Sequence, residues 1–275
     1  MPKRLLILLV ALGWAHEARA GGAADPKQIV DQAVQTEISA SRDDHSRWLY
    51  YDFDSKPGNT VRQWVAETGS GALHLVLVQK GRTLSPAAQR AQMDQFIADP
   101  DERARQRKSG EHDDKQSEDL LRLLPEAFVW SRVSDANGLI RLHFVPDPRF
   151  KPPSWEARAF AAMEGDLVVD SRGHRIASLR GRLVRDVRFC GGLCGGLSSG
   201  GTFSVARRQT GPGIWQIVET HVHIHGTALL FKNISEDEDE EKTRFRELPG
   251  NISLPQAEAL LLEQKGVEAE TRASR

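Results

Sequence analysis

Residues 47–80 read RWLYYDFDSKPGNTVRQWVAETGSGALHLVLVQK, and this stretch decides the fold. It predicts three strands, at Arg47–Asp54, Thr60–Glu67 and Ala72–Lys80, separated by the turn sequences Lys-Pro-Gly-Asn and Gly-Ser-Gly. Apolar side chains alternate along the first and third strands, which is typical of an antiparallel sheet with one buried face. The alternating residues are Leu49, Tyr51, Phe53, Leu73, Leu75 and Leu77.

The same pattern resumes in the second half of the chain. Strands at 128–133 and 139–145 flank an Asn-Gly turn, which favours a hairpin. The residues that alternate along the second of these strands are Ile140, Leu142 and Phe144. Further strands are predicted at 166–170, 174–179, 183–189, 202–209, 214–225 and 228–232. The acidic run Glu236–Glu241 is predicted to be a loop.

Helical segments flank and interrupt these strands. They are expected at 26–43, 86–98, 117–124, 155–163 and 257–262, the last followed by a polar tail at 266–275. Residues 99–119 are very polar and carry charges of both signs, so we expect a mobile, solvated insertion there. Because strands and helices do not alternate regularly, the sequence predicts an α+β fold with one large antiparallel sheet.

The N-terminus has the three parts of an export signal. Lys3 and Arg4 precede the apolar run Leu5–Ala15, and Ala18-Arg19-Ala20 supplies the small residues that signal peptidase recognises. The run is shorter than the roughly 20 residues that a membrane-spanning helix needs. We therefore expect a signal peptide at 1–20 and a single periplasmic or secreted domain at 21–265, with no transmembrane segment after cleavage near Ala20.

Composition and motifs restrict the possible functions. The 275 residues contain 37 Lys and Arg against 38 Asp and Glu, a formal net charge of −1, which argues against a charge-driven nucleic-acid binder. Neither the His-Glu-x-x-His helix of zinc proteases nor the Gly-x-Gly-x-x-Gly dinucleotide turn is found in the sequence. The sequence therefore predicts a non-enzymatic protein that has no cofactor and binds no nucleic acid.

His221, His223 and His225 alternate with two aliphatic residues. On a strand, the three imidazoles project from one face. Such a row supplies ligands that zinc, copper and nickel prefer, which makes it a candidate metal site. The same row is also compatible with a partly exposed sheet face, because the sequence has no second cluster of His, Cys and Asp spaced so as to complete the coordination of a metal.

Cys190 and Cys194 flank a Gly-Gly-Leu segment within a glycine-rich stretch that ends at Gly201. In an oxidising compartment, the two thiols are a candidate disulfide across a tight turn. A flexible lid over a cavity is the alternative interpretation of the glycines. Their spacing does not match the Cys-x-x-Cys pattern of redox catalysts.

The order of strands from Phe144 to Leu183 resembles that of a known protein family. Phe-Val-Pro-Asp-Pro ends a strand at 144–148, and the strands Glu-Gly-Asp-Leu-Val-Val-Asp at 164–170 and Arg-Ile-Ala-Ser-Leu-Arg-Gly-Arg-Leu at 175–183 follow. With the later strands up to Lys232, this order resembles that of the Lol-type periplasmic carriers, the outer-membrane lipoprotein-sorting proteins, and their anti-sigma co-factor relatives. The resemblance covers roughly residues 26–232. It implies a strongly curved half-barrel sheet, closed by helices, that encloses an apolar cavity for acyl chains.

We therefore expect an exported protein that binds a lipid or the acyl chains of a lipoprotein on the concave face of this sheet. Sheet parity nominates nine residues for that face: Leu49, Tyr51, Phe53, Leu73, Leu75, Leu77, Ile140, Leu142 and Phe144. The alternative for these nine is that they simply pack a closed core. Two other functions stay open, a metal-binding protein or metalloenzyme built on the histidine row, and an envelope sensor or assembly partner.

Overall fold

The computed structural model describes residues 24–188, 195–227 and 236–273. The expected signal peptide at 1–20, the candidate disulfide between Cys190 and Cys194, and the strand predicted at 228–232 lie outside these residues. Within them, no helix is both long and apolar enough to span a membrane.

Eleven strands in the described part of the chain form one antiparallel sheet, which confirms the predicted α+β class. Across the sheet their order is β4-β3-β2-β1-β14-β12-β11-β8-β7-β6-β5, so the sheet is open, with β4 and β5 at its edges. The strands are β1 (Arg47–Lys56), β2 (Asn59–Thr68), β3 (Gly71–Gln79), β4 (Arg82–Thr83), β5 (Phe128–Ala136), β6 (Leu139–Pro146), β7 (Met163–Asp170), β8 (Ile176–Leu183), β11 (Thr202–Gly211), β12 (Ile214–Ile224) and β14 (Glu236–Leu248). A second, small sheet is formed by β9 (Val187–Arg188), β10 (Gly196–Leu197) and β13 (Gly226–Thr227).

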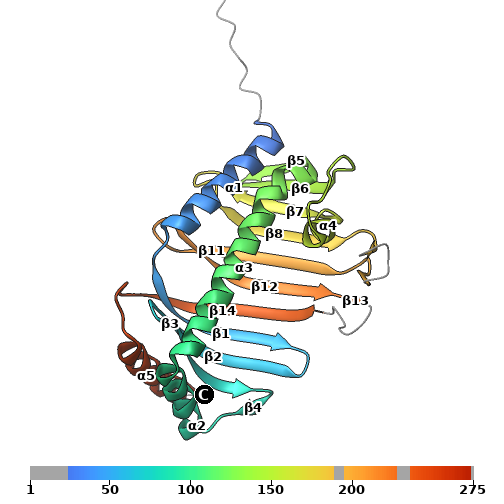
Figure 1. Cartoon of the computed structure of the whole chain (residues 1–275). Coiled ribbons are helices and arrows are strands. Elements are labelled where there is room, and N and C mark those ends of the chain that lie inside the picture. The colour runs from blue at the N-terminus through green and yellow to red at the C-terminus, as the bar shows by residue number, and fades with distance from the viewer. Residues whose placement is uncertain (1–23, 189–194, 228–235, 274–275) are drawn as a thin grey trace, which may run out of the picture.

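Helices pack at both ends of the large sheet and leave its centre less covered. The helices of the described residues are α1 (Pro26–Asp43), α2 (Pro86–Ala98), α3 (Pro100–Ala127), α4 (Trp155–Phe160) and α5 (Leu254–Ala273). The first core cluster joins α1, α4 and the C-terminal end of α3 to β5–β8. The second joins α2 and α5 to β1–β3. Figure 1 shows α3 running from the β4 end of the sheet to the β5 end.

The acidic run forms part of a central strand, which corrects the prediction of a loop. Glu236–Glu241 is the first half of β14, which pairs with β1 on one side and β12 on the other. The carboxylates are accommodated because neighbouring strands supply cations and imidazoles opposite them. Lys56 lies 2.9 Å from Glu238, and His221 lies 2.6 Å from Asp239. Opposite charges across strands stabilise a sheet, an effect that strand propensity alone does not capture.

Residues 99–119 are helical and do not form a loop, which corrects a second prediction. They are the N-cap and the first two-thirds of α3, one helix of 28 residues. Asp99 caps the helix by accepting hydrogen bonds from the N–H groups of Asp101 and Glu102, and Pro100 occupies the first turn. Pairs one turn apart, such as Arg105 with Glu102, add support. A helix that is polar all round is typical of a span between two packed regions.

Other boundaries agree more closely with the sequence. α1 has the predicted limits, and it begins with Asp25 as its N-cap and Pro26 in its first turn. α4 is shorter than predicted because β7 begins at Met163, and α5 is longer, extending to Ala273. The strand predicted at 183–189 is divided between the end of β8 and the short β9.

Candidate functional site

The nine residues nominated for a concave surface lie in two separate packed regions. Ile140, Leu142 and Phe144 belong to the first core cluster. Leu49, Leu73 and Leu75 belong to the second, and Tyr51 and Leu77 pack against it. Phe53 is partly buried, and the guanidinium of Arg62 lies 5.4 Å from the centre of its ring.

Cross-strand pairing places the two groups on opposite faces of the sheet. Directly paired residues of antiparallel strands project from the same face. One row of such pairs runs across seven strands from Leu142 in β6 to Asp54 in β1, through Leu167, Leu179, Val205, Thr220 and Glu240. Asp54 therefore shares the face of Leu142. Its neighbour Phe53 projects from the other face, together with Tyr51 and Leu49.

We call the face of Leu142 and Asp54 the α3 face, and the face of Leu49 and Phe53 the α5 face. The expectation that all nine residues line one surface is corrected, because three lie on the α3 face and the other six pack on the α5 face or against its cluster. Sheet parity relates residues within one strand but does not relate strands far apart in the sequence. That any of the nine contacts a ligand stays a prediction.

The middle of α3 crosses the α3 face without packing closely on it. All residues from 107 to 117 are exposed. The N-terminal part of the helix is held at β3, where the Gln106 side chain bonds both the N–H and the C=O of Ala72, at 2.8 and 3.0 Å. The C-terminal part is held by the buried Leu124 and Ala127 in the first core cluster. α3 is therefore anchored at its two ends and solvated between them.

On the α3 face, apolar side chains of the central strands are only partly covered. Leu142 and Leu167, near one edge of the sheet, are 0% exposed. Burial decreases along the same face toward the centre, where Phe203, Val205, Val222 and Ile224 are all partly exposed. Val205 and Val222 belong to neither core cluster, so their side chains are incompletely packed within the protein. We call these four residues the apolar strip.

A row of charges borders the apolar strip on β1 and β14. Asp54 lies directly opposite Glu240, and Asp52 lies opposite Lys242. Lys242 lies 3.0 Å from Glu240, while Lys56 reaches Glu238. Burial raises the pKa of Asp54, and the charges of Glu238 and Glu240 add to this effect against the opposing effect of Lys56. The α3 face is therefore apolar on β11 and β12 and acidic on β1 and β14.

A partly buried network of hydrogen bonds joins α3 to this acidic side. Gln63 donates to Asp52 at 2.7 Å, so its carbonyl oxygen is free to accept from the Nδ1 of His74, 3.1 Å away. The Nε2 of His74 then faces the amide of Gln106, at 3.5 Å. Burial lowers the pKa of His74 to about 4, with a further contribution from the charge of Lys242, so this histidine is neutral at pH 7.

Asp52, at the end of this hydrogen-bond network, is incompletely hydrogen-bonded. It is buried, and its Oδ1 has no hydrogen-bond partner. Burial raises the pKa of Asp52 in the folded protein, so folding costs free energy whenever the carboxylate is ionised. Asp52→Asn keeps the oxygen that accepts from Gln63, and we expect it to raise the free energy of unfolding at pH 7 by about 1 kcal/mol.

The stability advantage of Asp52→Asn should depend on pH. Because the folded pKa lies above the unfolded pKa, the original protein gains stability as the pH falls through the folded value. Asp52→Asn lacks that gain, so its advantage should shrink between pH 7 and pH 4. Urea unfolding at both pH values measures it, with the exposed Asp113→Asn as control. A less stable Asp52→Asn at pH 7 would contradict the assignment.

The histidine row lies on the α5 face, paired with the acidic strand β14. His221 Nδ1 lies 2.6 Å from Asp239, and His223 Nδ1 lies 3.3 Å from Asp237. His225 is more exposed and lies 3.9 Å from Asp237. Among the residues that the structure describes, no group of three or more His, Cys, Asp or Glu side chains is placed to hold a metal ion. The imidazoles instead pair with carboxylates across the strands.

Residues 196–200, Gly-Leu-Ser-Ser-Gly, have the Gly-x-Ser-x-Gly spacing of a hydrolase nucleophile elbow. A true elbow at this position would favour an enzyme and oppose the non-enzymatic prediction. That motif requires a strand, a sharp turn and then a helix. Here Ser198 follows β10, its N–H donates to the carbonyl of His225 at 2.8 Å, and the chain continues into the strand β11. The spacing is present, but its local structure is not that of an elbow.

A buried ionic cluster fastens α1 to the sheet, and the sequence pattern did not reveal it. Glu37 lies on the apolar stripe of α1 and is 4% exposed. It accepts two hydrogen bonds from Arg175, at 2.9 and 3.1 Å, and pairs with Arg207. The backbone N–H of Ile176 donates to Glu37 as well, at 2.6 Å. The carboxylate of Glu37 within an otherwise apolar helical stripe could have indicated a buried ion pair. The sequence around Arg175 and around Arg207 does not identify either arginine as its partner.

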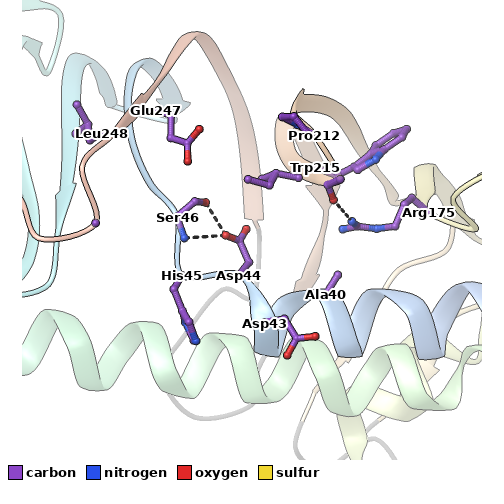
Figure 2. A pocket seen from close by; sticks show the side chains of 13 residues that line it. Ala40, Asp43, Asp44, His45, Ser46, Arg175, Pro212, Trp215, Glu247 and Leu248 are labelled. Atoms are coloured by element: carbon purple, nitrogen blue, oxygen red, sulfur yellow. Dashed lines mark hydrogen bonds between the residues drawn. The ribbon is translucent and has the colours of Figure 1, made fainter.

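Beside this cluster, a pocket of about 500 Å³ opens at the C-terminal end of α1. Figure 2 shows its walls, which come from the last turn of α1 and the residues after it, the β11–β12 hairpin and the end of β14. Asp44 and Glu247 point into the space, and Arg175 borders it from the sheet. None of the sequence-nominated residues lines this pocket.

Comparisons with known proteins were negative at every level. No protein-family model, no curated protein and no solved structure matches this chain.

Proposed function

We propose that this chain binds an apolar chain, from a lipid or from the acyl group of a lipoprotein, on the α3 face of its sheet. The observation that carries the proposal is the apolar strip, which lies partly exposed on the central strands of the α3 face. Apolar surface that packing leaves partly exposed on one side of a sheet marks a candidate binding surface. The resemblance to the lipoprotein-sorting carriers leads to the same class of ligand.

The anchoring of α3 supports access to the strip. Gln106 fixes the helix at β3, whereas Leu124 and Ala127 fix it at the other end, so the solvated span can shift without loss of either anchor. An acyl chain gains about 0.8 kcal/mol for each buried CH₂ group, so partial burial of a long chain provides micromolar affinity or better. The charged row then lies where the polar end of such a ligand would meet solvent.

Val222→Asp tests the site directly. Val222 pairs with Phe203 on the α3 face and is partly exposed, so a carboxylate there should oppose an apolar ligand and still leave the fold intact. We expect the affinity for a fluorescent fatty acid to fall at least roughly tenfold, equivalent to about 1.4 kcal/mol. Displacement titrations measure the affinity, and native mass spectrometry shows whether lipid co-purifies.

Val129→Asp is the matched control. Val129 is 47% exposed on β5, it projects from the α5 face, and its substitution introduces the same charge. We expect it to bind the fatty acid as the original protein does. Failure of the original protein to take up any fatty acid, or equal losses in Val129→Asp and Val222→Asp, would overturn the proposal.

A further inference from the structure

The pocket at the end of α1 has a composition that selects one class of ligand. Its walls bring together four parts of the sequence, at 40–46, 175, 212–215 and 247–250, and its volume of about 500 Å³ is within the usual range for small-molecule sites. It shares no residue with the apolar strip. A ligand in this pocket therefore occupies a different place from the acyl chain of the proposed function.

The charge of the pocket is negative. Asp43, Asp44 and Glu247 line it, and Arg175 is the only Lys or Arg among its lining residues. The guanidinium of Arg175 is already engaged, since it donates to Glu37 and, at 2.7 Å, to the carbonyl oxygen of Gly213. Among the described residues, Asp43, Asp44 and Glu247 form no ion pair.

The end of α1 adds to this negative potential. The C-terminal end of a helix carries a partial negative charge from its unpaired carbonyls and favours cations. The basic residue in the last turn of α1 is Arg42, which pairs with Glu118 of α3 at 2.9 Å and is not among the residues that line the pocket. Figure 2 shows the carboxylates of Asp44 and Glu247 directed into the space beside this helix end.

His45 and Ser46 are the other polar side chains of the wall, and apolar side chains supply a further part of it. Pro212, Ile214, Trp215 and Leu248 line the pocket. Asp44 is held in place because its Oδ1 accepts from the N–H of Ser46 at 2.9 Å and from the Ser46 hydroxyl. A fixed carboxylate beside an aliphatic and aromatic wall is complementary to a cationic group attached to an apolar chain.

We infer that this pocket binds an organic cation, a primary amine or guanidinium group carried on a short apolar chain. The probe is hexylammonium, and the comparison ligands are hexanoate and hexanol, which have the same chain with a negative or no charge. We expect saturable shifts of the Gly213 and Gly250 amide signals in ¹H–¹⁵N spectra with hexylammonium alone. Added salt should weaken the binding, because the attraction is electrostatic and the pocket is open to solvent.

Asp44→Asn combined with Glu247→Gln removes two charges and retains the Asp44 oxygen that Ser46 contacts. We expect hexylammonium to bind this variant at least roughly tenfold more weakly. The matched control, Asp113→Asn with Glu111→Gln, removes two charges from the solvated span of α3 and should leave the affinity unchanged. Val222→Asp should also leave it unchanged, which separates this pocket from the acyl surface.

Three results would overturn the inference. The first is an absence of saturable shifts at Gly213 and Gly250. The second is an equal response to hexanoate or hexanol, which would mean that the wall is merely apolar. The third is equal affinity in the pocket variant and the control variant, which would place hexylammonium elsewhere on the chain.

Discussion

Glu37→Gln is expected to lower the free energy of unfolding by about 3–5 kcal/mol, the usual cost of breaking a buried ion pair from one side. Glu37 is 4% exposed and is the shared partner of Arg175 and Arg207. The amide cannot neutralise either guanidinium. Its NH₂ group replaces one of the two oxygens, and each oxygen faces donors: Arg175 and the N–H of Ile176 at Oε1, and Arg175 and Arg207 at Oε2. Two cations would remain between α1 and the sheet without their counter-charge.

The same substitution should change the acid sensitivity of the fold. Burial raises the pKa of Glu37, but the hydrogen bonds from Arg175 and the charge of Arg207 outweigh burial and hold the pKa below its usual value of 4.5. A folded pKa below the unfolded value gives a stabilisation that is complete above the unfolded pKa. It is lost as the pH falls through the folded pKa. Glu37→Gln should therefore lack this part of the loss of stability between pH 5 and pH 2.

Glu126→Gln is the appropriate control. Glu126 pairs with Lys27 at 2.6 Å, but both side chains are well exposed, and surface pairs contribute about 0–1 kcal/mol. Urea unfolding followed by circular dichroism at pH 7 compares the two variants. If Glu37→Gln costs no more than Glu126→Gln, the cluster contributes to the position of α1 without stabilising the fold.

Much of the sheet was predictable because each strand carries its own signal. Leu73 and Leu75 alternate within one short run, and the turn after Asn59 and the Asn137-Gly138 hairpin mark where strands reverse. β14 carries the opposite signal, since its acidic half is typical of a solvated loop. Its place in the sheet depends on Lys56 and His221, which lie far away in the sequence and supply partners only after folding.

The candidate site was harder to predict for a related reason. Parity grouped Leu49 with Leu142, but only the register across seven strands reveals that they lie on opposite faces. Val205 and Val222 of the apolar strip carry no local sequence pattern that distinguishes them from core residues, and their partial exposure becomes visible only in the folded sheet. The long polar stretch of α3 was interpreted as a mobile loop, so a helix that crosses this face was not foreseen.

Gly165→Ala is expected to destabilise the fold by about 3 kcal/mol, because two strands meet there without room for a side chain. Gly165 of β7 pairs with Gly181 of β8, and the row continues to Phe144 on one side and Phe203 on the other. A methyl group on Gly165 would lie 1.9 Å from the backbone carbonyl oxygen of Arg180. Backbone cannot rotate away as a side chain can, so β7 and β8 would have to separate and weaken their hydrogen bonds.

Gly181 and Gly69 have more space around them than Gly165 and allow a graded comparison. A methyl group on Gly181 would lie 2.5 Å from the ring of Phe203, a side chain that is only partly buried and can move toward the apolar strip. Gly69 has open space around its position. Urea unfolding should therefore rank the losses as Gly165→Ala, then Gly181→Ala at about 1–2 kcal/mol, then Gly69→Ala within about 0.5 kcal/mol. Because Phe203 belongs to the strip, Gly181→Ala should also alter fatty-acid affinity, whereas Gly69→Ala should not. If Gly165→Ala is as mild as Gly69→Ala, β7 and β8 do not approach at Gly165 closely enough to exclude a side chain.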